Sequence, residues 1–234
     1  DFTPLTEGFV YAEPNDLANL EQLIKANKCA AVMMEVVQGE GGVMPLDEAY
    51  VKGAAKLCEQ YDLLLICDEV QVGNGRSGKL YGYMHYGVQP DIVSTAKGLA
   101  GGLPLGATLL GEKVQDVLSA GTHGSTFGGN PVCCAGAVNI LSRIDDRLLE
   151  GVRERSDYLR RTLQAAPGIR SVTGMGLMLG LEIDIPAREF AERALREGVL
   201  VTTAKQKIRL LPALNIPMEL LKTAAQALVH CAAE

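Results

Sequence analysis

Two apolar runs in this 234-residue sequence each end beside a charged residue. Residues 63–66 lead through Cys67 to Asp68, and residues 91–95 lead to Lys97. Short apolar runs bounded by turn signals are typical of buried strands in a parallel sheet. In open α/β sheets the ligand crevice lies beyond the carboxyl ends of such strands. The sequence therefore predicts a carboxylate and an amine held together at one edge of a sheet.

An acid and a lysine in that position suit pyridoxal 5'-phosphate. The amine of Lys97 can form a Schiff base with the cofactor's aldehyde, and Asp68 can keep the ring nitrogen protonated so that the ring accepts electrons. The simpler alternatives are that Asp68 caps a helix at the end of its strand and that Lys97 is a solvated loop lysine. Because Asp68 and Lys97 occur together with Gln71, we favour the cofactor-binding interpretation over these alternatives.

The order of elements changes near Ser142. Before it, strands and helices alternate, which favours a parallel α/β sheet; after it, helices mix with short strands, which suggests a small α+β domain. We therefore predict two domains, residues 1–142 and 143–234. The strands are expected at 30–37, 63–67, 91–95, 107–110, 169–173, 177–183, 199–202 and 207–210. The main helices are expected at 16–26, 47–61 (capped by Asp47), 131–144, 147–165, 186–197 and 217–233.

Charge and cysteine usage narrow the class of protein. The formal net charge is −6 with no basic run, which argues against nucleic acid or an anionic membrane as a partner. No apolar stretch approaches the roughly 20 residues that span a bilayer, and residues 1–4 do not resemble a signal peptide. The six cysteines form no C-x-x-C motif, so we expect reduced thiols in a cytoplasmic protein, with a vicinal Cys133–Cys134 disulfide as the alternative. The three histidines lack metal-ligand spacing, and no metal site is expected.

Several further segments occur in an order that points to one family. They are Glu-Val-Val-Gln-Gly-Glu-Gly-Gly-Val at 35–43, Asp-Glu-Val-Gln at 68–71, Gly-Arg-Ser-Gly at 75–78, Gln-Pro-Asp-Ile at 89–92, Ala-Lys-Gly at 96–98, Gly-Thr-His-Gly-Ser-Thr-Phe-Gly-Gly-Asn-Pro at 121–131 and Ile-Arg-Leu-Leu-Pro-Ala-Leu-Asn at 208–215. Together they resemble the class III (subgroup II) aminotransferases across nearly the whole chain. The resemblance implies the aspartate aminotransferase-type fold (fold type I). Residues 1–142 would then be the C-terminal part of the large cofactor-binding domain, with a mixed, mostly parallel sheet.

The resemblance also implies a role for each site residue. Lys97 would be the catalytic Schiff-base lysine, Asp68 the partner of the pyridinium nitrogen, and Gln71 the partner of the phenolic oxygen. Ser125 and Thr126 match a loop that reaches the cofactor phosphate of a partner subunit. On the substrate side, Arg209 matches the arginine that binds the α-carboxylate of glutamate and 2-oxoglutarate. Glu40 matches the acid that pairs with that arginine while the other amino donor is bound, and Glu35 matches a further acid of the site.

Each of these residues also has a simpler interpretation. Gln71 could be a surface amide and Thr126 an ordinary turn residue. Arg209 could be a surface charge paired with Glu219, which would leave Glu40 a solvated loop acid. Glu35 could merely hydrogen-bond within its loop. Arg76 is expected to brace its glycine-rich loop, and His85 and His123 are expected to be structural.

The implied activity is transfer of an amino group from N-acetylornithine to 2-oxoglutarate, in arginine biosynthesis, by a homodimer with shared active sites. Donors of the ornithine, succinylornithine or 4-aminobutyrate type remain alternatives. Two departures from the family matter. Val36 stands where the family often has proline, and the family's N-terminal segment, with its own phosphate-binding loop, precedes the position that matches Asp1. A second hypothesis is therefore that this chain alone is an incomplete fragment that does not hold the cofactor.

Overall fold

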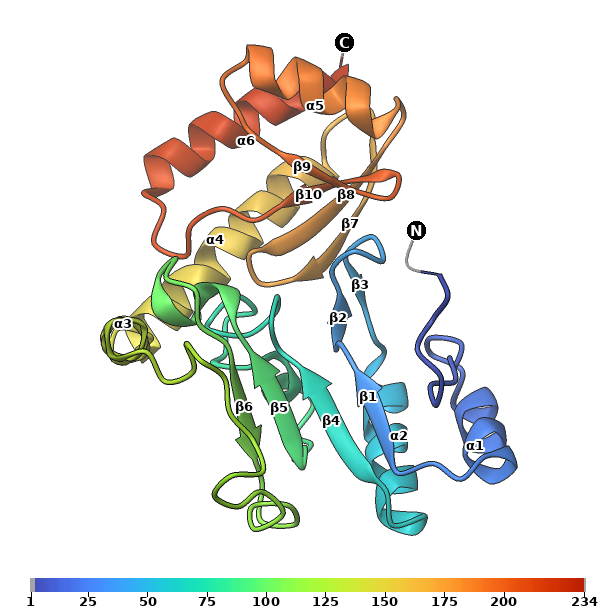
Figure 1. Ribbon diagram of the computed structural model, residues 1–234. Helices are drawn as coiled ribbons and strands as arrows, with labels where there is room; N and C mark the ends of the chain where they lie inside the picture. The colour runs from blue at the N-terminus through green and yellow to red at the C-terminus, as the bar shows by residue number, and fades with distance from the viewer. Residues whose placement is uncertain (1–2, 234) are drawn as a thin grey trace.

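The computed structural model describes residues 3–233, which form two four-stranded sheets, a short two-stranded sheet and helices packed against them (Figure 1). The first is a four-stranded sheet with strand order β1-β4-β5-β6. Its strands are β1 (Ala31–Met34), β4 (Leu64–Asp68), β5 (Ile92–Thr95) and β6 (Ala107–Leu110). β1, β4 and β5 run parallel, and β6 runs antiparallel to β5. This mixed, mainly parallel sheet confirms the α/β class predicted from the alternation of elements.

Two helices lie on one side of this sheet. α2 (Glu48–Gln60) packs against β1 and β4, and α1 (Leu17–Ala26) packs against α2. α1 begins where expected because the Asp16 carboxylate accepts a hydrogen bond from the Asn19 N–H at 2.9 Å. Asp47 occupies the N-cap position of α2 as predicted, but its side chain makes no capping hydrogen bond.

The second sheet is antiparallel, with strand order β7-β8-β10-β9. Its strands are β7 (Ile169–Met175), β8 (Met178–Ile183), β9 (Thr202–Ala204) and β10 (Lys207–Leu210). The helices packed with it are α4 (Asp146–Gln164), α5 (Ala187–Arg196) and α6 (Met218–Ala233). None of the helices in the described part of the chain is long and apolar enough to cross a bilayer.

Short elements connect the two sheets (Figure 1). The hairpin of β2 (Val37–Gln38) and β3 (Met44–Pro45) lies between them, where β3 contacts β7. The single-turn helices η1 (Gly82–His85) and η2 (Lys97–Ala100) follow β4 and β5, and α3 (Pro131–Leu141) packs against η2. The loops after β4 and β5 therefore face the second sheet.

The buried apolar residues form two main clusters. The first includes Val36, Val51 and Cys67, and the second includes Leu163 and Phe190; each of these side chains is fully or almost fully buried. Two cores fit the predicted division into two domains, whose boundary near residue 142 stays a prediction. Burial raises the pKa of the Cys67 thiol to about 12, so it stays protonated at neutral pH.

Neither Cys133 nor Cys134 is in a disulfide, so the alternative of a vicinal bridge is wrong.

Arg76 joins the two clusters. Its guanidinium donates to the carbonyl oxygens of Leu177 at 3.2 Å and Pro212 at 2.5 Å, and the Leu177 N–H donates back to the Arg76 carbonyl at 2.9 Å. Burial lowers the pKa of Arg76 to about 10, which still leaves it charged at neutral pH. Arg76 was expected to brace its own loop, and it instead fixes that loop to the second sheet.

Three elements differ from the sequence-based expectation. The strand expected at 30–37 ends at Met34, because the chain turns at Glu35 and enters the β2–β3 hairpin. The strand expected at 199–202 starts only at Thr202, because the C-terminal turn of α5 extends through the Val199 N–H, which donates to Ala194. The helix expected to reach Ile144 stops at Leu141, and a new helix, capped by Asp145, begins at Asp146.

Candidate active site

Asp68 and Lys97 follow neighbouring parallel strands, as the apolar runs predicted. Asp68 is the last residue of β4 and pairs with Ser94 of β5, three residues before Lys97. One carboxylate oxygen of Asp68, Oδ1, accepts a hydrogen bond from the Val70 N–H at 2.9 Å. The acid therefore orders the turn after its strand with one oxygen, and its other oxygen has no bond to the described residues.

Lys97 begins η2 in an unusual backbone conformation. Its φ is +48°, in the left-handed region that residues other than glycine rarely adopt. Such a conformation costs on the order of 1–3 kcal/mol and persists only where the surroundings impose it. The Lys97 side chain is exposed, and it makes no hydrogen bond or ion pair with residues 3–233.

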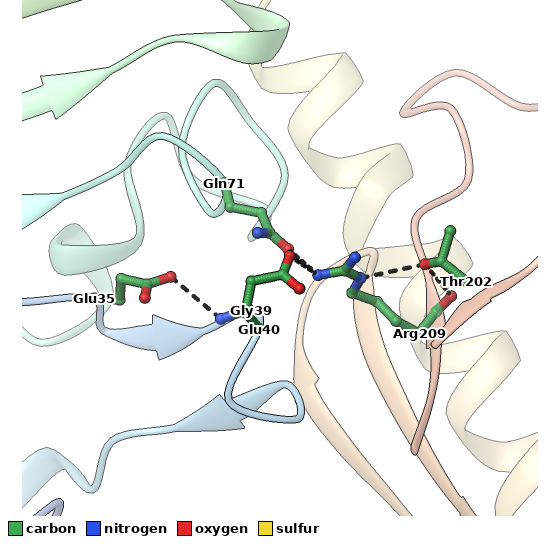
Figure 2. Close-up of polar contacts among 6 residues, drawn as sticks. All are labelled: Glu35, Gly39, Glu40, Gln71, Thr202 and Arg209. Carbon is green, nitrogen blue, oxygen red and sulfur yellow. Dashed lines mark hydrogen bonds and ion pairs between the residues drawn. The ribbon is translucent and has the colours of Figure 1, made fainter. Parts of the chain in front are cut away.

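Arg209 lies at the centre of a group of polar contacts shown in Figure 2. Its Nη1 donates to the Glu40 carboxylate at 2.5 Å and to Gln71 Oε1 at 3.2 Å, and its Nε donates to Thr202 Oγ1 at 3.2 Å. The Arg209 side chain is only 12% exposed, whereas that of Glu40 is 76% exposed. The hydrogen bond from Arg209 is the main reason that the pKa of Glu40 lies below its ordinary value.

This contact decides between two interpretations of Arg209. Glu219 pairs with Lys222 on α6 and not with Arg209, so the pairing considered for a surface charge is wrong. Four different segments meet at the Arg209 guanidinium: the loop after β2, the loop after β4, β9 and β10. An arginine held at an accessible carboxylate in this way can exchange that carboxylate for the carboxylate of a ligand.

Glu35 lies beside the same site and is half-buried. Its carboxylate accepts a hydrogen bond from the Gly39 N–H at 3.2 Å, which is the loop contact considered as the simpler interpretation (Figure 2). Burial raises the pKa of Glu35, and the nearby Asp68 carboxylate adds to the rise, while the Gly39 N–H and Lys97 oppose it. Its role toward a substrate remains a prediction.

A cleft of about 520 Å³ opens beside these residues. Its lining includes Gln71, Asn74 and Lys97 from the loops after β4 and β5, together with Leu214 and Asn215. The cleft therefore has room for a ligand of cofactor or amino-acid size next to the lysine.

Ser125 and Thr126 do not join this group. Both lie in the exposed loop 121–129, and neither is bonded to Asp68, Gln71 or Lys97 within residues 3–233. Within this chain, the group around Lys97 therefore has no phosphate-binding contact from this loop. Their proposed role in a partner subunit stays a prediction.

The donor set suits the ring of pyridoxal phosphate. An acid with one carboxylate oxygen unbonded, an amide, and an amine without a partner among residues 3–233 follow two neighbouring strands, and Gln71 and Lys97 line one cleft. These are the groups that a pyridine nitrogen, a phenolic oxygen and an aldehyde require. The fold and the residues at its strand ends therefore fit the class of α/β proteins that bind this cofactor through a lysine.

Comparison with known proteins then gives the family. The model of the class III aminotransferases matches residues 7–232. The chain belongs to the class III aminotransferase family, and the resemblance found in its motifs is confirmed.

Individual relatives agree with this assignment. The chain is 45% identical over its whole length to acetylornithine aminotransferase of Haemophilus ducreyi, covering 60% of that protein. It is 44% identical to succinylornithine transaminase of Salmonella newport, with 95% of this chain and 57% of that protein covered. Among solved structures, the ornithine aminotransferase of Toxoplasma gondii superposes with a TM-score of 0.92 at 34% identity, covering all of this chain and 58% of the other. The chain thus spans about 60% of the length of curated relatives.

Sequence reasoning missed two residues of the site, Asn74 and Thr202. Thr202 pairs directly with Arg209 in the β9–β10 hairpin, and its hydroxyl is bonded to the guanidinium. Knowing the hairpin register would have identified it, but the strand was expected to end at residue 202. Asn74 looked like an ordinary loop residue between two glycines, and only its tertiary contacts distinguish it.

Proposed function

We propose that the protein containing this chain is a pyridoxal-phosphate-dependent aminotransferase that moves an amino group from N-acetylornithine to 2-oxoglutarate. The observation that carries the proposal is the Arg209–Glu40 ion pair next to Gln71 and the two strand ends. An enzyme that binds two different substrates in turn needs an arginine for one and a way to neutralise it for the other. Glu40, which is exposed and paired with Arg209, can provide that.

The chain's own residues divide the work as follows. When bound, the cofactor supplies an electron sink for the bond that breaks at the substrate α-carbon. Asp68 would hold a proton at the ring nitrogen, and Gln71 would bind the phenolic oxygen. Lys97 Nζ would bind the cofactor covalently between turnovers and would carry the proton to and from the α-carbon during them. Arg209 would bind the α-carboxylate of glutamate or 2-oxoglutarate through two parallel hydrogen bonds.

We further propose that the protein is a cytoplasmic homodimer in arginine biosynthesis, with Ser125 and Thr126 binding the phosphate in the partner's site. The exposure of loop 121–129 supports this, since a glycine-flanked Ser-Thr turn offers hydroxyl and backbone donors to an anion. With this loop away from Lys97, Ser125 and Thr126 give the isolated chain no phosphate contact at its own lysine within residues 3–233. We therefore expect it to hold little cofactor by itself.

Single-turnover kinetics of the two half-reactions test the proposal. In the whole protein, Arg209→Ala should slow the glutamate half-reaction far more than the acetylornithine one. Loss of a buried charged hydrogen bond costs about 2–5 kcal/mol, or tens- to thousands-fold in kcat/KM. Glu40→Ala should have the opposite effect on the two half-reactions, with tighter glutamate binding and weaker acetylornithine binding. If Arg209→Ala slowed both half-reactions equally, Arg209 would be a structural charge.

The identity of the amino donor needs its own comparison. The succinylornithine and ornithine enzymes among the relatives make those donors the main alternatives. We expect kcat/KM to be highest with N-acetylornithine. An equal or higher value with ornithine, succinylornithine or 4-aminobutyrate would reject the acetylornithine assignment while leaving the aminotransferase proposal in place.

A further inference from the structure

Asn74 connects the loop after β4 to the residues just before Lys97. Its Nδ2 donates to Thr95 Oγ1 at 2.9 Å and to the Ala96 carbonyl at 3.1 Å. The residue is only 5% exposed and has a φ of +54°, a conformation that asparagine tolerates better than most side chains. The two hydrogen bonds span 21 and 22 residues of sequence, so they fix tertiary structure at the end of β5.

The chemistry of its partners fixes the direction of the Asn74 amide. A backbone carbonyl can only accept, so the Nδ2 group must face Ala96. The amide oxygen, Oδ1, then points elsewhere, and it is buried without a hydrogen-bond partner. Asn74 lines the same cleft as Lys97. Oδ1 itself has almost no exposed surface, so it does not open into that cleft, and the hydrogen bonds of Nδ2 are the contacts through which Asn74 can act.

The Ala96 carbonyl is held from two sides. It accepts from Asn74 Nδ2 and also from the Leu99 N–H at 3.0 Å. That carbonyl belongs to the peptide that enters Lys97, whose left-handed φ needs support from its surroundings. The Asn74 side chain therefore restrains the peptide that sets the direction of the Lys97 side chain.

We propose that Asn74 is the positioning residue of Lys97. It holds the carbonyl of the Ala96–Lys97 peptide through one hydrogen bond, and its other hydrogen bond, to Thr95 Oγ1, anchors the Asn74 side chain to the end of β5. The inference rests on the proposed function, in which Lys97 is the reactive amine.

Three substitutions in the whole protein separate the contributions of Asn74. Asn74→Gly removes the side chain but tolerates the left-handed backbone. Asn74→Asp keeps the shape but cannot donate to Ala96 once ionised. Thr95→Val removes only one of the two partners and serves as the milder control. A misplaced reacting group can cost about 100-fold in rate, so we expect Asn74→Gly to lower kcat 10- to 100-fold, with KM changed less than threefold. Thr95→Val should lower kcat less than fivefold.

A purely structural role would not reproduce two further results. Trace acylation of the cofactor-free protein with acetic anhydride, repeated across pH, measures the reactivity of Lys97 against the exposed Lys56 as internal reference. In Asn74→Gly this reactivity should differ at least threefold from that in the parent protein. In Asn74→Asp, kcat should recover toward low pH, where the protonated acid can donate to Ala96 again. If Asn74→Gly is too unstable to measure, Asn74→Asp and Thr95→Val still give both readouts.

Unchanged kcat, Lys97 reactivity and pH profile in the Asn74 variants, with Lys97→Ala inactive, would overturn the inference alone. An active Lys97→Ala variant would overturn the proposed function itself.

Discussion

We predict that the buried Glu69 carboxyl makes the free energy of unfolding depend measurably on pH. Its side chain is fully buried, and its carboxylate accepts hydrogen bonds from the Gly82 N–H at 2.7 Å and the Tyr83 N–H at 2.8 Å. Burial raises the pKa of Glu69 to about 7 from an ordinary value of 4.5, although the two N–H groups oppose the rise. Each unit of pKa corresponds to about 1.4 kcal/mol, so the difference amounts to about 3 kcal/mol.

The sign follows from proton binding. Between pH 4.5 and 7 the folded protein keeps a proton on Glu69 that the unfolded chain has lost, so the free energy of unfolding falls as pH rises. The contribution is fully present below pH 4.5 and is lost above pH 7.

Urea unfolding at several pH values, compared between the parent and Glu69→Gln, isolates this group. The stability of the parent minus that of the variant should fall by about 3 kcal/mol between pH 4.5 and 7.5. Glu59→Gln, at an exposed position, controls for the loss of one carboxylate. A difference that does not change with pH would show that the two N–H groups fully offset burial, and it would refute the reasoning.

Two further predictions concern the contact between the sheets and the assembly. A Cβ at Gly176 would lie 2.4 Å from the Arg76 carbonyl oxygen at a φ of +55°, so Gly176→Ala should cost about 2–4 kcal/mol of unfolding free energy. Gly87→Ala has the same backbone strain at a φ of +66°, but a Cβ there would meet nothing within 4 Å, so it should cost only about 1–2 kcal/mol. Equal losses of unfolding free energy in the two variants would show that the clash at Gly176 does not contribute. In the whole protein, mixing inactive Lys97→Ala and Thr126→Ala subunits should restore one competent site per heterodimer, and no recovery after verified subunit exchange would place Thr126 within its own site.

The strand ends could be predicted from the sequence because local signals set them. An apolar run followed by Asp68, and another followed by Lys97, leave little freedom in where β4 and β5 stop. Elements whose limits depend on tertiary contacts were placed less well. The β2–β3 hairpin begins where Glu35 turns back to bond Gly39, and no local pattern in the apolar run signals that turn.

The same distinction applies to the site. The pairing of Arg209 with Glu40 links residues 169 positions apart, and only the family resemblance suggested it. Asn74 had no such guide. Its importance depends on a tertiary contact between Asn74, which has a left-handed backbone conformation, and the end of β5. Neither periodicity nor composition predicts that contact.

Gln71 explains how the two ends of the proposed site act together. Arg209 can only donate, so Gln71 Oε1 must face it, and the two N–H groups of Gln71 are left for acceptors. Glu40 is one such acceptor, since a hydrogen bond from Gln71 contributes to lowering its pKa. Under the proposed roles, a substrate carboxylate that displaced Glu40 from Arg209 would leave an N–H group of Gln71 available to an anionic oxygen such as the phenolic oxygen of the cofactor. Gly39 allows this arrangement, because a Cβ there would lie 2.4 Å from the Gln71 amide. Under the proposed roles, carboxylate binding at Arg209 therefore changes the hydrogen bonding at the cofactor ring through the Gln71 side-chain amide.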